Sequence, residues 1–297
     1  MKITATLGVL IFLLGVLTPR QAKSKRPPVF LNHFYVVLDS ATYKDIEQSA
    51  FLRGEFAVTE QRTTVRTDMT YTGLYFYGTN TYFEFFDVAS DPSNQVGFSG
   101  IALGVDREGE LQSAGKELSF SFSMDQETIT RQYNGKQVPW FYAGKLKDFP
   151  LGSSLAVWFM EYLPQFLNEW NPQSGARNQG MSRKQILQRY SAVLKDIPPK
   201  PYFDDVIALT VAVNDAHGKK LAELCKLLGY TERNDGDVTV LKGRDIELRL
   251  VPQTETSRGI REIKMRVSRK PKDKDEFRFG SKSVLKFHSN GLATWSF

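Results

Sequence analysis

The residues best suited to chemistry are a histidine and a glutamate on two separate predicted strands. His33 lies in a run rich in β-branched and aromatic residues, Phe30 to Leu38, and Glu84 lies in another, Thr81 to Val88. An imidazole and a carboxylate together form a ligand set that Zn, Fe, Ni or Mn accepts. A carboxylate among Tyr and Phe side chains is costly to bury unless it is paired or bound to a cation. A shared site is therefore the first hypothesis for these two residues.

The alternation of side chains along these strands predicts what surrounds the pair. Successive residues of a strand point to opposite faces, so His33 lies with Tyr35, and Glu84 lies with Tyr82 and Phe86. The Phe, Val and Leu residues between them point the other way and are expected to cover a helix. The pair then lies on the concave face of a sheet, with Tyr35, Tyr82 and Phe86 as the walls of a ligand pocket.

The order of predicted elements recurs along the chain. Residues 30–90 are expected to form a strand, a helix and three further strands, and a looser copy runs from 99 to 162. Residues 203–252 begin the same order again, and the tail adds three more predicted strands. The sequence therefore predicts a protein built from repeated β-α-β-β-β modules.

The third copy aligns on the first through the shared order of strand, capped helix, glycine and strand. The alignment places Leu38 over Val213 and Glu84 over Glu247. Ala208 then stands where the first copy has its histidine. Because Glu247 has no histidine on its matching strand, it is predicted to be structural.

Three segments carry a resemblance to a known superfamily. These are Ala222 to Tyr230 with the strands after it, Asn32-His33, and Phe83-Glu84-Phe85. Together they resemble the vicinal oxygen chelate superfamily of glyoxalase, bleomycin-resistance and extradiol dioxygenase proteins, and the whole chain resembles an uncharacterised exported bacterial family related to it. The resemblance implies an α+β fold in which paired β-α-β-β-β modules form cupped mixed sheets. It also implies one divalent metal, with ligands from the first and fourth strands of each module.

The ligand set that the resemblance implies is incomplete in this chain. Gly100 and Ala208 stand where a second histidine would be expected. Glu161 is predicted to supply a partner carboxylate, which gives His33, Glu84 and Glu161 as the metal ligands and leaves one position open. The alternative is that His33 and Glu84 bond to each other or to a tyrosine hydroxyl.

The first residues are predicted to be a signal peptide. Lys2 precedes fifteen apolar residues, Ile3 to Leu17, and Ala22 and Ser24 have the small-residue spacing of a cleavage site. Cleavage after Ser24 gives a periplasmic or secreted protein. An uncleaved anchor is the alternative, and no later segment is apolar and long enough to span a membrane.

The mature chain is predicted to divide into three parts. Residues 25–175 form the paired glyoxalase-like modules, 176–200 an amphipathic connecting helix, and 201–297 a second glyoxalase-like region with an incomplete pair. Whether modules pair within one chain or in a homodimer stays open.

Composition excludes several classes of function. Loss of residues 1–24 lowers the formal charge from +6 to +3, and the remaining charges are mixed in sign, so a nucleic-acid partner is not expected. The single cysteine, Cys225, lies on an apolar helix face and is predicted to be buried. His217 is predicted to be exposed in a first helical turn, and His288 to lie near a strand end. No G-x-S-x-G, phosphate-loop or dinucleotide pattern occurs.

Two functions are compatible with these features. The first is a binding protein that holds a small molecule in the cupped sheet. The second is a metal-dependent lyase, isomerase or dioxygenase of the vicinal oxygen chelate type.

Overall fold

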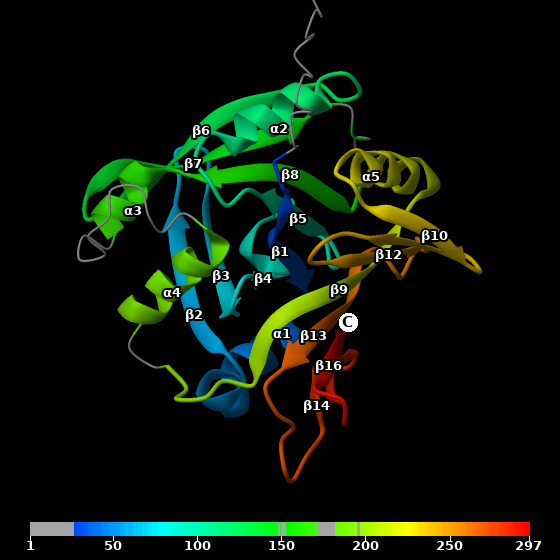
Figure 1. The fold of residues 1–297 in the computed structure, drawn as a ribbon. Helices are drawn as coiled ribbons and strands as arrows, with labels where there is room; N and C mark the ends of the chain where they lie inside the picture. Colours follow the sequence, from blue (N-terminus) through cyan, green and yellow to red (C-terminus); the bar gives the residue numbers. More distant parts are fainter. Residues whose placement is uncertain (1–26, 148, 150–152, 171–181, 195–196) are drawn as a thin grey trace, which may run out of the picture.

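The computed structural model describes residues 27–147, 149, 153–170, 182–194 and 197–297 (Figure 1). The predicted signal peptide, residues 1–24, lies outside this described part. Within it, no helix combines the length and the apolar character needed to cross a membrane.

The first sheet has eight strands in the order β2-β3-β4-β1-β5-β8-β7-β6. It consists of two consecutive β-α-β-β-β modules. The first module contains β1 (Phe30–Leu38), α1 (Ser40–Gln48), a short π-helix (Leu52–Phe56), β2 (Val58–Val65), β3 (Thr70–Tyr77), β4 (Tyr82–Asp87) and a 3-10 turn (Val88–Ser90). The second contains β5 (Ser99–Gly104), α2 (Glu110–Leu118), β6 (Met124–Tyr133), β7 (Lys136–Leu146) and β8 (Leu155–Tyr162). Two connecting helices follow, α3 (Pro164–Trp170) and α4 (Arg183–Val193).

The second sheet also has eight strands, in the order β10-β11-β12-β9-β13-β16-β15-β14. The third module contains β9 (Phe203–Val213), α5 (Asp215–Leu227), β10 (Thr231–Asp235), β11 (Val238–Lys242) and β12 (Glu247–Pro252). The last four strands are β13 (Gly259–Val267), β14 (Glu276–Phe279), β15 (Ser283–Phe287) and β16 (Leu292–Ser296). The predicted α+β class, with repeated modules in cupped mixed sheets, is confirmed.

The last four strands depart from the repeat because no helix separates β13 from β14. In the other modules a crossover helix returns the chain to the same end of the sheet, so the first and fourth strands pair in parallel, as β1 and β4 do. Between β13 and β14 there is only a loop, so β14 starts at the end of the sheet where β13 finishes and runs in the opposite direction. β13 and β16 consequently pair antiparallel.

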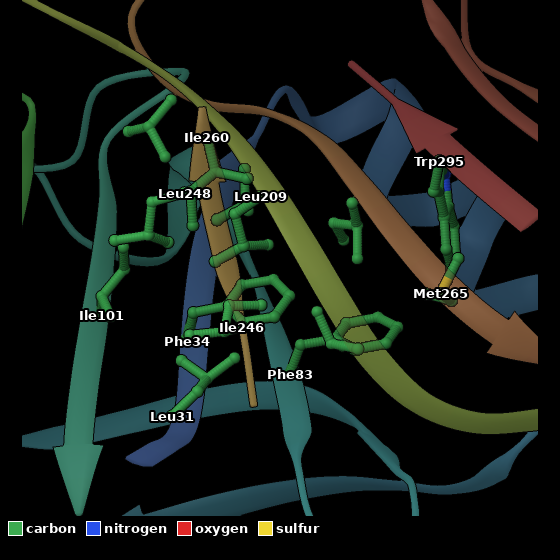
Figure 2. Close-up of a cluster of buried hydrophobic side chains, with 14 of the residues drawn as sticks. Leu31, Phe34, Phe83, Ile101, Leu209, Ile246, Leu248, Ile260, Met265 and Trp295 are labelled. Carbon is green, nitrogen blue, oxygen red and sulfur yellow. The ribbon is translucent and has the colours of Figure 1, made fainter. Parts of the chain in front are cut away.

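The two sheets share one hydrophobic core. Phe34 and Phe83 of the first sheet and Leu209 and Trp295 of the second are almost fully buried in it (Figure 2). The helices α1, α2 and α5 add their apolar faces to the same core, which includes Cys225 as predicted. Each sheet therefore turns its other face outward. We call these outward concave faces the first cup and the second cup.

The register of the third module corrects the predicted alignment. His33 lies opposite Tyr82 on β4, whereas Ala208 lies opposite Glu247 on β12. If Ala208 matches His33, then Glu247 matches Tyr82, and Arg249 matches Glu84. The prediction that Glu247 lies over Glu84 is wrong by two residues. The face was predicted correctly, because a shift of two preserves the side of a strand.

The connecting helices pack into the first cup. Phe166 and Trp170 of α3 and Ile186 and Tyr190 of α4 belong to a second hydrophobic cluster, which includes residues of the concave face of the first sheet. The Tyr190 ring stacks on Tyr77 of β3 with 4.6 Å between centroids. The first cup is therefore partly filled by the chain itself.

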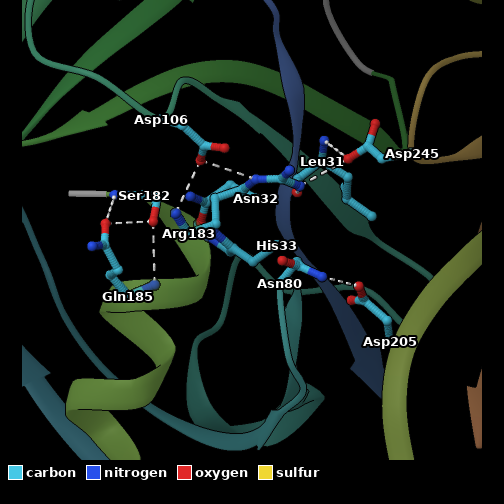
Figure 3. Close-up of polar contacts among 10 residues, drawn as sticks. All are labelled: Leu31, Asn32, His33, Asn80, Asp106, Ser182, Arg183, Gln185, Asp205 and Asp245. Carbon is cyan, nitrogen blue, oxygen red and sulfur yellow. Dashed lines mark hydrogen bonds and ion pairs between the residues drawn. The ribbon is translucent and has the colours of Figure 1, made fainter. Parts of the chain in front are cut away.

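Arg183, at the start of α4, connects the two sheets (Figure 3). Its Nη1 donates to the Leu31 carbonyl on β1 at 2.6 Å and lies 2.8 Å from Asp245 Oδ2 in the turn before β12. Its backbone N–H and Nε donate to Asp106, after β5, at 2.9 and 3.3 Å. Burial raises the pKa of Asp245, and the Arg183 charge opposes that rise. The buried guanidinium thus holds together segments that are distant in the sequence.

We expect Arg183→Met to lower the free energy of unfolding by about 3 kcal/mol, because it removes a buried guanidinium that binds the Leu31 carbonyl and two partly buried carboxylates. Urea unfolding measures the change. Arg233→Met is the matched control, since Arg233 is more than half exposed and its pair with Asp235 spans 3.7 Å. The control should change stability by no more than about 0.5 kcal/mol. Equal losses in both variants would contradict the role assigned to Arg183.

Candidate functional site

A cavity of about 230 Å³ lies in the first cup. Its lining includes the five predicted residues His33, Tyr35, Tyr82, Glu84 and Phe86. They come from β1 and β4, which are adjacent in the middle of the sheet and pair in parallel. The cavity is therefore built on the two strands that the sequence analysis singled out.

The His33 ring is held in a defined orientation. Its Nδ1 lies 2.9 Å from the side-chain carbonyl Oδ1 of Asn32, so Nδ1 carries the proton and donates. The ring stacks on Tyr82 with 4.5 Å between centroids and meets Trp158 edge-on at 5.4 Å. Its Nε2 then carries the lone pair and lies 3.7 Å from Oε1 of Glu84.

Glu84 is buried beside this lone pair. It lies opposite Tyr75 on β3 and Tyr35 on β1 and is 5% exposed. Burial raises its pKa to about 8, although the charges of Arg62 and Arg66 and the Tyr75 hydroxyl act in the opposite direction. Glu84 therefore holds a proton at neutral pH and can donate it in a hydrogen bond.

Burial has the opposite effect on His33. Desolvation, aided by the Arg66 charge, lowers the pKa of its imidazole to about 3. The imidazole is therefore neutral at pH 7. The two side chains together present one hydrogen-bond acceptor and one donor, with no net charge.

Aromatic rings form much of the remaining wall. Phe86 meets Tyr35 and Tyr71 edge-on, at 5.4 and 5.6 Å between centroids. Trp158 of β8 lies 6.1 Å from Tyr35 across the cup. Flat apolar surfaces thus enclose the polar pair.

Two arginines near the pair were missed by the sequence analysis. Arg66 lines the cavity and donates to both oxygens of Asp68, at 2.8 and 2.6 Å. Arg62 lies 2.8 Å from Glu60 and 4.2 Å above the Tyr75 ring. The alternation of side chains along β2 could have indicated both arginines, because residues 60, 62, 64 and 66 share one face.

The prediction that Glu161 completes a metal site with His33 and Glu84 is wrong. Its carboxylate accepts from the backbone N–H groups of Gly109 and Leu111, both at 2.8 Å, at the start of α2. Its neighbour Met160 lines the cavity, so Glu161 points to the helix side of the sheet. There it satisfies free N–H groups at a helix N-terminus and interacts favourably with the helix dipole.

The second module has no ligands at the corresponding positions. Matching β5 to β1 places Gly100 where His33 stands, and the register then places Trp158 where Glu84 stands. A Cβ atom on Gly100 would collide with the Tyr35 ring and lie 2.7 Å from Trp158. Aromatic packing therefore occupies the volume that a second histidine would need.

The residues present do not fit a complete metal site. His33 and Glu84 provide two ligand side chains, one fewer than the three protein ligands of a typical catalytic zinc centre. Across the described ranges, no group of three or more His, Cys, Asp or Glu side chains could hold a metal ion.

The other two histidines lie elsewhere. The prediction that His217 is exposed is wrong, because it is 1% exposed on α5 and packs edge-on against Phe149 at 5.1 Å. Burial lowers its pKa to about 4. His288 lies just after β15, with its Nε2 3.0 Å from the Thr294 hydroxyl.

A family model matches residues 31–297, nearly the whole chain, and is described as a family of unknown function, DUF5829. The chain belongs to this family. None of the curated proteins matches the DUF5829 chain.

Several solved structures are similar to it at low identity. A hypothetical protein from Staphylococcus aureus is 12% identical, with a TM-score of 0.47 over 77% of this chain and 88% of the other. A xylose isomerase-like TIM barrel/4-hydroxyphenylpyruvate dioxygenase fusion protein is 10% identical (TM-score 0.44), and the match covers 82% of this chain but 37% of the fusion. An extradiol ring-cleaving dioxygenase from B. fuscum is 10% identical, with a TM-score of 0.40 over 92% and 73%.

The buried pair predicts a specific dependence of stability on pH. Glu84 binds its proton more tightly in the folded chain, because its pKa rises from 4.5 to about 8. The stability it contributes is complete below pH 4.5 and is lost as the pH rises through about 8. His33, whose pKa falls from 6.5 to about 3, costs stability as the pH falls below 6.5. Between about pH 6.5 and 8, the folded chain holds a proton on Glu84 that the unfolded chain has already released.

We therefore expect the stability of the wild type, relative to Glu84→Gln, to fall between pH 6.5 and 8. The limiting slope is about 1.4 kcal/mol per pH unit. Gln mimics the neutral carboxyl and does not titrate. Urea unfolding of both proteins across this range measures the difference. A constant difference would show that Glu84 is ionised in the folded chain.

Proposed function

We propose that this DUF5829 protein binds a small, planar and uncharged molecule in the first cup. The proposal includes export, because residues 1–24 have the features of a signal peptide. The observation that carries it is the buried His33–Glu84 pair at an aromatic cavity, where Nε2 and Oε1 lie 3.7 Å apart. These two atoms are too far apart for a normal hydrogen bond with each other.

The pair indicates the polar part of the ligand. The protonated Glu84 carboxyl donates, and the unprotonated Nε2 of His33 accepts. A group with an acceptor beside a donor, such as a primary amide, complements both atoms. A neutral group suits this position because both side chains of the pair are neutral and the Arg66 guanidinium in the lining is already paired with Asp68.

The walls indicate the rest of the ligand. Rings of Tyr35, Tyr82, Phe86 and Trp158 line the cavity, and flat aromatic surfaces favour a stacked or edge-on ring. A volume of about 230 Å³ lies below the roughly 300–1,000 Å³ of pockets for drug-sized ligands. A single ring with a short polar substituent has the required shape.

Benzamide is the probe that tests this proposal. We expect saturable binding, followed by calorimetry and by the fluorescence of Trp158 and Trp140, which line the cavity. Glu84→Met removes the donor at similar size and should weaken binding by about 10-fold or more, because one hydrogen bond to a buried group is lost. Lys264→Ala, in the second cup, is the control and should bind benzamide as the wild type does.

Benzoate provides a second comparison. It has the same ring and size, but its carboxylate offers no donor to Nε2, so it should bind more weakly than benzamide. Equal affinity for both probes, or equal affinity of Glu84→Met and the wild type, would refute the assigned polar contact. Failure of both probes to bind would refute the ligand class.

One observation favours the alternative of a metal-dependent lyase, isomerase or dioxygenase. The hydrogen bond from Nδ1 to Asn32 leaves Nε2 free beside a carboxylate, an arrangement common in metal-binding histidines. Two ligand side chains remain too few for the usual catalytic set.

Elemental analysis of the purified protein and of His33→Ala separates the two functions. Under the binding proposal, both proteins should contain less than stoichiometric metal. The variant should lose about 1–3 kcal/mol of stability, because Glu84 and Asn32 lose a buried polar neighbour. A stoichiometric metal that disappears in His33→Ala would instead establish the metal-dependent alternative.

A further inference from the structure

The second cup contains a separate and larger cavity, of about 650 Å³. All the residues that line it come from strands of the second sheet or from the turns between them. Its floor is charged, in contrast to the aromatic floor of the first cup. Its size lies within the range of small-molecule sites.

Strand register places the charged side chains of the floor in one row. Reading across the sheet from β11 to β16, directly opposed residues are Lys242, Glu247, Ala208, Lys264 and Thr294. Opposed residues share a face, so these five side chains point into the same cup. Lys264 therefore lies next to the smallest residue of the row, Ala208, and Lys242 lies on the other side of it, beyond Glu247.

Two of the three acids that line the cup, Asp245 and Glu247, are paired with arginines, and one of these arginines, Arg249, also lines the cup. Glu247 lies 3.3 Å from Arg249, and Asp245 lies 2.8 Å from Arg183. No salt bridge within the described residues reaches Lys242 or Lys264. The cup therefore keeps an excess of positive charge available to a ligand.

The spacing of the strands allows the ammonium groups of Lys242 and Lys264 to reach the same ligand. Three strand spacings separate the backbones of Lys242 and Lys264, roughly 14 Å. Lysine side chains are long and flexible, so both ammonium groups can reach an anion above Ala208. Arg244 stands in the β11–β12 turn, and His288 and Asn290 stand in the β15–β16 turn, which gives the opposite rims further polar groups.

We propose that the second cup binds a small organic anion with two or more charged groups, held between Lys242 and Lys264 over Ala208. Glu262 also lines the cup, on the same face of β13 as Lys264. Its carboxylate favours a ligand that carries a hydroxyl donor as well as its anionic oxygens. The anionic oxygens can be carboxylates or phosphates. This site lies on a different sheet from the first cup and does not depend on the function proposed there.

Calorimetric titration of the purified protein with citrate, and separately with inorganic phosphate, tests the site. We expect 1:1 binding of at least one anion, weakened by added salt because the contacts are partly exposed. Tighter binding of citrate identifies a polycarboxylate ligand, and tighter binding of phosphate identifies a phosphorylated one. Either result supports the proposal, and saturation by neither anion overturns it.

Charge-reversal variants locate the anion. Lys264→Glu and Lys242→Glu should each weaken binding by about 10-fold or more. Lys219→Glu carries the same charge change on the solvent-exposed side of α5, where Lys219 pairs with Asp215 at 2.7 Å, and should bind as the wild type does. Equal weakening in all three variants would show a general charge effect and overturn the site.

A variant that keeps every charge provides an independent check. Ala208→Leu fills the space above the row and should weaken anion binding, with circular dichroism confirming the fold. Glu84→Met should leave anion binding unchanged. Unchanged anion binding in folded Ala208→Leu would overturn the placement of the ligand over Ala208.

Discussion

The burial of one face of each sheet in a single shared core constrains everything else in this protein. Phe34, Phe83, Leu209 and Trp295 reach that core from opposite sides, and the helices α1, α2 and α5 complete it. A strand that commits one face to a core must turn alternate residues outward. The same alternation that buries these side chains therefore places His33 and Glu84 in one cup and Lys264 in the other.

The two cups differ in what covers their outward faces and in the side chains that line them. In the first, α3 and α4 cover part of the concave face, and the cavity that remains is lined mainly by aromatic rings. Desolvation there drives both His33 and Glu84 towards their neutral forms. In the second, charged side chains on strands and turns line an open cavity. A closed apolar environment and an open charged one favour different ligands, even on related sheets.

Arg183 joins a helix that covers the first cup to both sheets. It stands at the first residue of α4 and also contacts β1 and the turn before β12. The helix that helps fill the first cup is thereby fixed to the edge of the second. Because a buried guanidinium needs several acceptors at once, the contact is formed only when both sheets and the connecting helix are in place.

Wherever a strand was predicted correctly, the sequence alone determined on which face of the sheet each candidate residue lies. His33, Tyr35, Tyr82, Glu84 and Phe86 all line one cavity, as alternation predicted, because the two-residue period is a local property of the backbone. The repeated modules were equally visible, since periodicity and helix caps are local signals. Cys225 was placed correctly in the core for the same reason.

Only the tertiary structure decided which residues meet. Glu161 lies one residue from a cavity position, and the partners that fix its role are the N–H groups of a helix about fifty residues earlier in the chain. The two-residue offset between Glu84 and Glu247 depends on strand register, and the burial of His217 depends on packing against Phe149. Register and packing are set by contacts between distant segments, so no local pattern contains them.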